Sequence, residues 1–156
     1  MTQIKERVLL TGATGFIGSR MIPELEKAGY DVYVLMRYVT GRFISGGNTK
    51  AVFADLKDEF SVRQAIRQVQ PERVINLAAI SPVAYSYDHP QEVTYVNYIG
   101  AINLAESCLR EVPNFKQFIT AGTSEEYGNQ KHFPIKEDAY LYPNSPYAVA
   151  KVATTK

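Results

Sequence analysis

Short runs of apolar, mostly β-branched residues alternate along the chain with longer stretches in which apolar residues recur every three or four positions. The short runs lack the strict polar alternation of a half-exposed strand, so they predict strands that are covered on both faces. The longer stretches predict amphipathic helices. The alternation predicts an α/β fold with βαβ units wound around a parallel sheet. The five expected strands are Arg7–Thr11, Asp31–Met36, Lys50–Phe53, Arg73–Leu77 and Phe115–Ala121.

Helix boundaries are indicated by residues that start or stop helices. Gly29 follows the first helical stretch, where a left-handed cap favours glycine, and Pro71 follows the second, where the helix must already have ended. The segment TGRFISGGNTK (residues 40–50) is rich in Gly and Thr and predicts a surface loop. We expect helices at roughly Ile17–Ala28, Asp58–Val69, Gln91–Arg110 and from Ser145 to the end of the chain.

Length and charge limit the classes of function. A chain of 156 residues predicts one domain, residues 1–156, and 17 basic against 16 acidic residues leave no basic stripe for binding nucleic acid. Cys108 is the only cysteine, and with His89 and His132 it offers no zinc-ligand spacing, so we expect no metal site. No secretory signal or membrane span is expected either, and a reducing, cytoplasmic setting fits best.

The stretch VLLTGATGFIGSR places three glycines directly after the first strand and at the start of the first helix. Gly12 allows a sharp turn, Gly15 a close approach of the backbone to a pyrophosphate, and Gly18 tight packing of the helix on the strand. The helix N-terminus offers free N–H groups to the anion. The alternative is a plain strand-to-helix turn. We expect a dinucleotide to bind Gly12, Thr14, Gly15, Phe16, Ile17 and Gly18.

The GxxGxxG spacing resembles the short-chain dehydrogenase/reductase superfamily, especially its extended branch. The resemblance implies a doubly wound Rossmann sheet. A complete sheet of this type has six strands, and only five are found. We therefore expect the chain to be truncated before the sixth strand and before the small C-terminal substrate domain of that family.

The end of the second strand indicates which dinucleotide binds. Asp31 lies about 20 positions after the glycines, but it begins the strand, whereas the acid that binds the ribose belongs at the far end. Arg37 stands at that end, and a guanidinium can pair with a 2′-phosphate. The sequence predicts NADP, with NAD the less favoured cofactor; a solvated charge is the alternative for Arg37.

The ends of the third and fourth strands also resemble signatures of the extended branch. Asp55 and Leu56 follow the third strand, and the resemblance implies that the acid meets the adenine. Asp55 could equally cap a helix. The fourth strand closes with NLAA, and the resemblance implies that Leu77, Ala78 and Ala79 line the path of the cofactor.

Tyr147 and Lys151 lie four positions apart in SPYAVAK, so they share one face of the last helix, which Pro146 can start. An ammonium group beside a phenol favours the phenolate, which makes the pair a candidate proton-transfer catalyst. The resemblance implies that both residues also contact the cofactor. The YxxxK pattern is common by chance; its place after a fifth strand and a glycine turn makes it informative.

The loop after the fifth strand contains Thr123, Ser124 and Glu125. The Thr-Ser-Glu order resembles the nucleotide-sugar 4,6-dehydratases, most closely the GDP-mannose 4,6-dehydratases, although many relatives have Asp where Ser124 stands. The resemblance implies that Thr123 holds the C4 oxygen of the sugar and that Glu125 removes the C5 proton. Epimerases of this branch share every motif except this acid.

The expected activity is therefore a lyase reaction on a nucleotide sugar, with Thr123, Glu125, Tyr147 and Lys151 as catalytic residues. A 4-epimerase or reductase of the same branch, and an NADP-binding module without catalysis, are the alternatives. The third helix and the last helix look like the pair that forms a homodimer interface in relatives. Ordinary core packing is the alternative for their apolar residues.

Overall fold

Five parallel strands form the sheet of the residues that the structure, a computed structural model, describes, namely 5–38 and 47–156. The strand order is β3-β2-β1-β4-β5, so the chain winds outward from β1 in one direction and then in the other. The doubly wound α/β sheet predicted from the sequence is thus confirmed. The strands are β1 (Arg7–Thr11), β2 (Asp31–Met36), β3 (Lys50–Phe53), β4 (Arg73–Asn76) and β5 (Gln117–Thr120).

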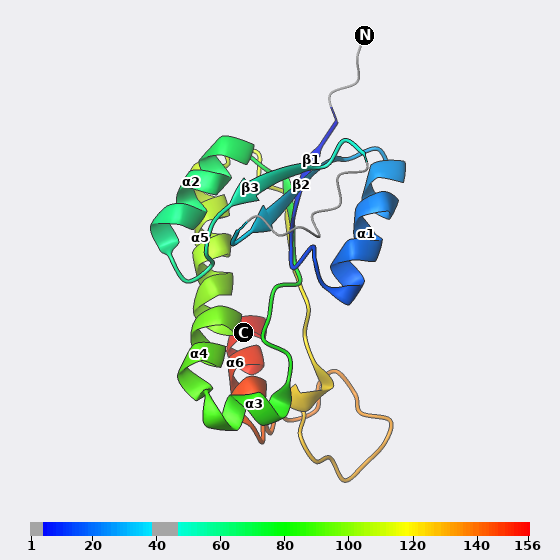
Figure 1. Ribbon diagram of the computed structural model, residues 1–156. Coiled ribbons are helices and arrows are strands. Elements are labelled where there is room, and N and C mark those ends of the chain that lie inside the picture. The colour runs from blue at the N-terminus through cyan, green and yellow to red at the C-terminus, as the bar shows by residue number, and fades with distance from the viewer. Residues whose placement is uncertain (1–4, 39–46) are drawn as a thin grey trace.

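Helices cover both faces of the sheet (Figure 1). Helix α1 lies on one face, α2 and α5 lie on the other, and α3, α4 and α6 gather beyond one end of the sheet. The bounds are α1 (Phe16–Lys27), α2 (Glu59–Val69), α3 (Val83–Asp88), α4 (Pro90–Thr94), the π-helical segment η1 (Tyr95–Ile99), α5 (Gly100–Glu111), the 3₁₀ turn η2 (Ser124–Glu126) and α6 (Pro146–Thr155).

The core has two layers because successive residues of a strand point to opposite faces. Leu9 of β1 packs with Ile66 of α2 and Leu104 of α5, whereas Leu10 packs with Ile22 of α1. The prediction that the strands are buried on both faces is confirmed for β1, whose residues are all buried from the second one onward. It is wrong for β3 and β5, each of which has two exposed positions because these strands lie at the two edges of the sheet.

Several boundaries differ from the sequence prediction. Strands β4 and β5 are shorter than expected, and α3 and η2 were not expected at all. The helix expected at Gln91–Arg110 begins at Pro90 and is interrupted by the π-helical segment. Gly29 has φ +91°, as the predicted left-handed cap requires.

Part of the predicted loop 40–50 lies outside the described residues. Within the described ranges, no helix has both the length and the apolar character that crossing a membrane requires. The same residues contain no group of three or more His, Cys, Asp or Glu side chains that could hold a metal ion.

Apolar residues of the two helices expected at a dimer interface divide between core and surface. Leu104 and Tyr147 are buried, whereas Leu109 and Val149 are exposed. The homodimer stays a prediction, which a measurement of molecular mass in solution would test.

Candidate functional site

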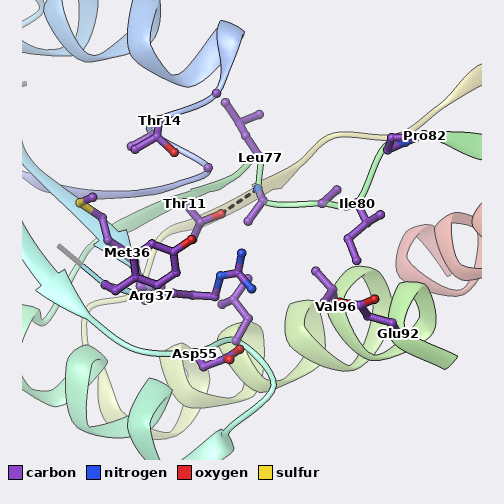
Figure 2. A pocket seen from close by; sticks show the side chains of 18 of the residues that line it. Thr11, Thr14, Met36, Arg37, Asp55, Leu77, Ile80, Pro82, Glu92 and Val96 are labelled. Atoms are coloured by element: carbon purple, nitrogen blue, oxygen red, sulfur yellow. Dashed lines mark hydrogen bonds between the residues drawn. The ribbon is translucent and has the colours of Figure 1, made fainter. Parts of the chain in front are cut away.

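A pocket of about 610 Å³ opens at the carboxyl ends of β1 to β4. Figure 2 shows side chains from these four strand ends and from the α4 segment arranged around it. Ligands of open α/β sheets bind at this edge, where the strand order reverses. Nine of the residues predicted to bind a cofactor line the pocket: Gly12, Thr14, Gly15, Arg37, Asp55, Leu56, Leu77, Ala78 and Ala79.

The glycine turn after β1 is tightly packed against backbone atoms, both its own and those of the loop after β4. Gly12 has φ +67°, and a Cβ atom there would lie 2.7 Å from the carbonyl carbon of Leu77. A Cβ on Gly18 would lie 2.3 Å from the carbonyl oxygen of Gly12, and one on Gly15 would lie 3.2 Å from the same oxygen. The turn therefore requires small residues for its own geometry, before any ligand is considered.

The start of α1 is open to an anion. Gly15 is the N-cap, no side chain caps the helix, and the first turn carries no acidic residue. The first N–H groups of a helix have no intrahelical acceptor and carry its positive dipole end, which favours phosphate groups. Phe16 and Ile17 are exposed here, with 83% and 59% of their surfaces accessible, and Gly18 is buried. These three residues lie outside the lining of the pocket.

The floor of the pocket is a buried polar link between β1 and β4. The hydroxyl of Thr11 donates to Oδ1 of Asn76 at 2.6 Å and accepts from the backbone N–H of Ala78 at 3.0 Å. Figure 2 shows the second of these bonds. The link fixes the loop after β4 against the glycine turn. Sequence analysis did not single out Thr11, because its role depends on a partner 65 positions away.

Arg37 and Asp55 enter the pocket from the ends of β2 and β3. Figure 2 shows the exposed Arg37 side chain extending into the pocket above Asp55. Asp55 does not cap α2, because the side chain of Asp58 accepts the capping bond from Phe60. Its Oδ1 atom instead accepts from the backbone N–H of Lys57 at 3.0 Å. This bond holds Asp55 in the wall of the pocket. The alternative that Asp55 caps a helix is therefore wrong.

The loop after β5 forms a short capped turn. The Thr123 hydroxyl accepts from the N–H of Glu125 at 3.3 Å, while the carboxylate of Glu126 accepts from the N–H of Thr123 at 3.1 Å. This reciprocal arrangement is a capping box around η2. Thr123 is half-buried and Glu125 is exposed. No hydrogen-bond partner of the Glu125 carboxylate occurs among the described residues.

Helix α6 carries Tyr147 and Lys151 on a buried face. Ser145 caps the helix by accepting from the N–H of Ala148 at 3.0 Å. The Lys151 ammonium donates to the carbonyl oxygen of Ala121 at 2.7 Å. Burial lowers the pKa of Lys151 below its ordinary value, and the negative charge of Glu126 opposes that shift.

Tyr147 lies next to the pocket but not in its lining. Its side chain is only 8% exposed and packs in a cluster with Val93, Val83 and Ile80. Ile80 also lines the pocket, so it connects this cluster to the pocket wall. Lys151 does not line the pocket either, and the catalytic roles of both residues stay predictions.

Ile80 is itself positioned by a residue that sequence analysis missed. Asn97, buried in the π-helical segment, accepts from the N–H of Ile80 at 2.8 Å and donates to its carbonyl at 3.0 Å. Tyr85 and Glu92, hydrogen-bonded to each other at 2.6 Å, line the same end of the pocket and were also missed. The hydrogen bond raises the pKa of Tyr85.

Comparison with known proteins gives consistent matches. A family model described as GDP-mannose 4,6 dehydratase matches residues 9–156. The chain is 33% identical to a GDP-mannose 4,6-dehydratase of Vibrio cholerae over 96% of its own length and 44% of that relative.

Among solved structures, UDP-glucose 4-epimerase of Thermotoga maritima with UDP-glucose matches with a TM-score of 0.85 at 33% identity, covering 95% of this chain and 48% of that one. The UDP-glucose 4-epimerase of Thermus thermophilus in complex with NAD matches with a TM-score of 0.85 at 32% identity. The match covers 96% of this chain and 48% of that one. The chain therefore spans less than half the length of these relatives.

Proposed function

Because this chain belongs to the GDP-mannose 4,6 dehydratase family, whose model matches residues 9–156, we propose that it forms the cofactor half of an NADP-dependent nucleotide-sugar 4,6-dehydratase. The choice of dehydration depends on Glu125, and one observation connects its loop to the candidate proton-transfer pair. The loop that holds Thr123 and Glu125 is bonded through its first residue, Ala121, to Lys151, four positions after Tyr147. A carboxylate, a hydroxyl and a phenol–ammonium pair thus belong to one connected unit.

The pocket fits a dinucleotide. Its volume lies in the range typical of small-molecule sites. The uncapped start of α1 suits the pyrophosphate, and Asp55 suits the adenine end. The preference for NADP depends on Arg37, whose guanidinium can pair with a 2′-phosphate. The Thermus thermophilus epimerase was solved with NAD, so this preference is the point to test.

When bound, the dinucleotide supplies hydride acceptance from C4 of the sugar and hydride return at C6. Tyr147 as phenolate takes the proton of the C4 hydroxyl, and Thr123 holds the C4 oxygen. The resulting 4-keto group acidifies the C5 proton, which Glu125 removes. The C6 hydroxyl leaves as water with the proton that Glu125 has taken from C5. C5 regains a proton in the last step, so the sugar loses one water overall. Lys151 holds the ribose and favours the phenolate of Tyr147.

A 4-epimerase is the second candidate, because the UDP-glucose 4-epimerase of Thermotoga maritima matches this fold with a TM-score of 0.85. An epimerase needs no base at C5, so Glu125 separates the two reactions. A dinucleotide-binding module without catalysis is the third candidate, and the Tyr147–Lys151 pair argues against it.

The test has a binding arm and a turnover arm. NADPH and NADH are each titrated into the protein, and we expect NADPH to bind more tightly; absence of binding by both would overturn the proposal. The protein is then incubated with NADP and GDP-mannose, UDP-glucose or dTDP-glucose. A 4-keto product lighter by one water supports the dehydratase. A 4-epimer of unchanged mass assigns the epimerase, and binding with neither product is the result expected both of a cofactor half alone and of the non-catalytic module.

The Glu125→Gln variant tests whether Glu125 is the base of the dehydration. Because a positioned proton-transfer group typically contributes 10² to 10⁴-fold, we expect dehydration to fall by about that factor. Cofactor affinity should not change, since Glu125 does not line the pocket. An undiminished dehydration rate in this variant would remove Glu125 from the mechanism.

A further inference from the structure

Two polar side chains at one end of the pocket take no part in the proposed reaction. Tyr85 of α3 and Glu92 of α4 both line the pocket, and the phenol donates to Oε2 of Glu92 at 2.6 Å. Figure 2 shows Glu92 on the other side of the pocket from Met36, the residue before Arg37. The pair therefore lies apart from the end of β2, where Arg37 enters the pocket.

The position of Tyr85 is fixed by a second neighbour, His89. The two rings pack with their centroids 4.2 Å apart and their planes tilted by 33°. The backbone N–H of His89 also donates to the carbonyl oxygen of Tyr85 at 3.0 Å. Helices α3 and α4 in turn pack against each other and against α6. The phenol is thus held in a defined place, although 37% of the surface of Tyr85 is accessible.

The pair offers hydrogen-bond acceptors and a negative charge. The phenol has one proton, and it is used in the bond to Glu92, so the phenol oxygen can only accept further bonds. The same bond raises the pKa of Tyr85, so the phenol keeps this proton. An ionised carboxylate only accepts, and within the described part of the chain no second hydrogen-bond or ion-pair partner of Glu92 occurs.

The side chains beside the pair are apolar. Ile80, Pro82 and Val96 line the same region of the pocket. In a mostly apolar site, a few polar groups determine which part of a ligand binds there. Tyr85 and Glu92 suit a part with N–H or O–H donors or with a positive charge, and they repel a phosphate group.

The parts of a dinucleotide can be assigned along the pocket on this basis. The pyrophosphate suits the uncapped start of α1, and a 2′-phosphate suits the guanidinium of Arg37. The remaining part is the nicotinamide riboside, which carries hydroxyl and amide donors. Its ring has a positive charge in the oxidised form only. This part is therefore the one that the acceptor pair suits.

We propose that Tyr85 and Glu92 form the subsite for the nicotinamide half of the dinucleotide, and that the charge of Glu92 favours the oxidised, cationic ring over the reduced one. The identity of the ligand rests on the proposed function. The proposal adds a consequence for that function, because the reaction begins with hydride acceptance. The protein would hold more tightly the form of the cofactor that can accept a hydride.

The experiment measures the affinities of NADP and NADPH by titration calorimetry. Glu92→Gln keeps the size of the side chain and removes its charge. Because a charge close to an ionised group changes its equilibrium by about 10-fold or more, we expect the ratio of NADP to NADPH affinity to fall about 10-fold. Tyr85→Phe removes the phenol and keeps the carboxylate charge, so it should retain the ratio of the wild type even where both affinities fall.

Two controls separate this subsite from general electrostatics. Adenosine 2′,5′-bisphosphate lacks the nicotinamide half, so its affinity should be the same for Glu92→Gln and the wild type. Glu106→Gln removes the same charge from α5, outside the lining of the pocket, and it should leave the ratio unchanged. If NADH binds and NADPH does not, the same ratio is measured with NAD and NADH.

The outcomes distinguish this subsite from the proposed function. If no dinucleotide binds the wild type, both are overturned. If dinucleotides bind and Glu92→Gln keeps the ratio, the subsite alone is overturned. An unchanged ratio together with weaker binding of UDP-glucose would assign the pair to the sugar substrate instead. A Glu92→Gln variant that does not fold would show that the pair is structural, which also overturns the proposal.

Discussion

Replacing Gly18 by alanine tests the geometry of the glycine turn. The new Cβ would lie 2.3 Å from the carbonyl oxygen of Gly12 and 2.8 Å from Cα of Ala13. Both are backbone atoms, which cannot rotate away, so we take the upper end of the usual overpacking cost, about 3 kcal/mol. Alanine gains about 1 kcal/mol over glycine as a helix former. We expect a net loss of about 2 kcal/mol in the free energy of unfolding.

The same substitution should weaken dinucleotide binding, because the Gly12 carbonyl that must move also accepts from the N–H of Gly15 at 3.0 Å. Gly29→Ala is the matched control. No atom lies within 4 Å of its added Cβ, but its φ of +91° disfavours alanine by about 1 to 2 kcal/mol. Its stability should fall by that amount while dinucleotide affinity stays constant.

Urea unfolding and NADPH titration of the three proteins provide both readouts. If Gly18→Ala is within about 0.5 kcal/mol of the wild type, a difference typical of surface substitutions, the steric argument is wrong. If Gly18→Ala loses stability but binds NADPH as the wild type does, the turn is a packing feature and not a cofactor cradle. That second result would leave the plain strand-to-helix turn as the correct interpretation.

Three further predictions follow from single side chains. In Arg37→Ser, NADPH affinity should fall about 10- to 100-fold with NADH affinity unchanged, since a hydrogen bond to a charged group contributes about 1.5 to 3 kcal/mol; parallel losses for both cofactors would contradict the assignment. Arg67 and Arg63 lower the pKa of Glu111 to about 2 from its ordinary 4.5. Glu111→Gln should therefore be less stable than the wild type above about pH 4.5, and urea unfolding at a series of pH values should show the difference vanishing toward pH 2; a pH-independent difference would count against it. Burial raises the pKa of Cys108 to about 12, so iodoacetamide should label it only after unfolding, as mass spectrometry can check, and rapid labelling of the native chain would refute this.

The sheet could be predicted well because its signal is local. The bounds of β1, β2 and β3 agree with the sequence prediction, since each is a charged residue followed by a short, mostly apolar run. The short helix α3 (Val83–Asp88) was missed because its six residues are too few to display a helical period. The π-helical segment was missed for another reason: its buried residue Asn97 bonds to Ile80, which lies 17 positions away in the sequence, so no local pattern indicates it.

The residues of the candidate site likewise fall into those that local sequence patterns predicted and those that they missed. Glycines and the strand-end residues could be found from order and spacing, and nine of them line one pocket. Thr11, Asn97 and Glu126 could not, because each acts through partners that only the fold brings near. Glu126, which is buried, follows two other polar residues in a predicted loop, where an exposed charge is the ordinary expectation.

The place of the pocket follows from the strand order, with no need of any particular side chain. Strand β1 has β2 on one side and β4 on the other, and the connections that leave β1 and β4 run to opposite faces of the sheet, as α1 and the α3–α5 region show in Figure 1. The loops after these two strands must therefore separate, which opens a crevice at this point of the edge. Particular residues then determine how closely the two loops approach each other. The bond between Thr11 and Asn76 closes its floor, and the missing Cβ of Gly12 lets the backbone at Leu77 approach where any larger residue would hold it away. A Gly12→Ala substitution would thus push the two loops apart where their backbones now touch, so titration of the variant with NADPH should show a loss of affinity.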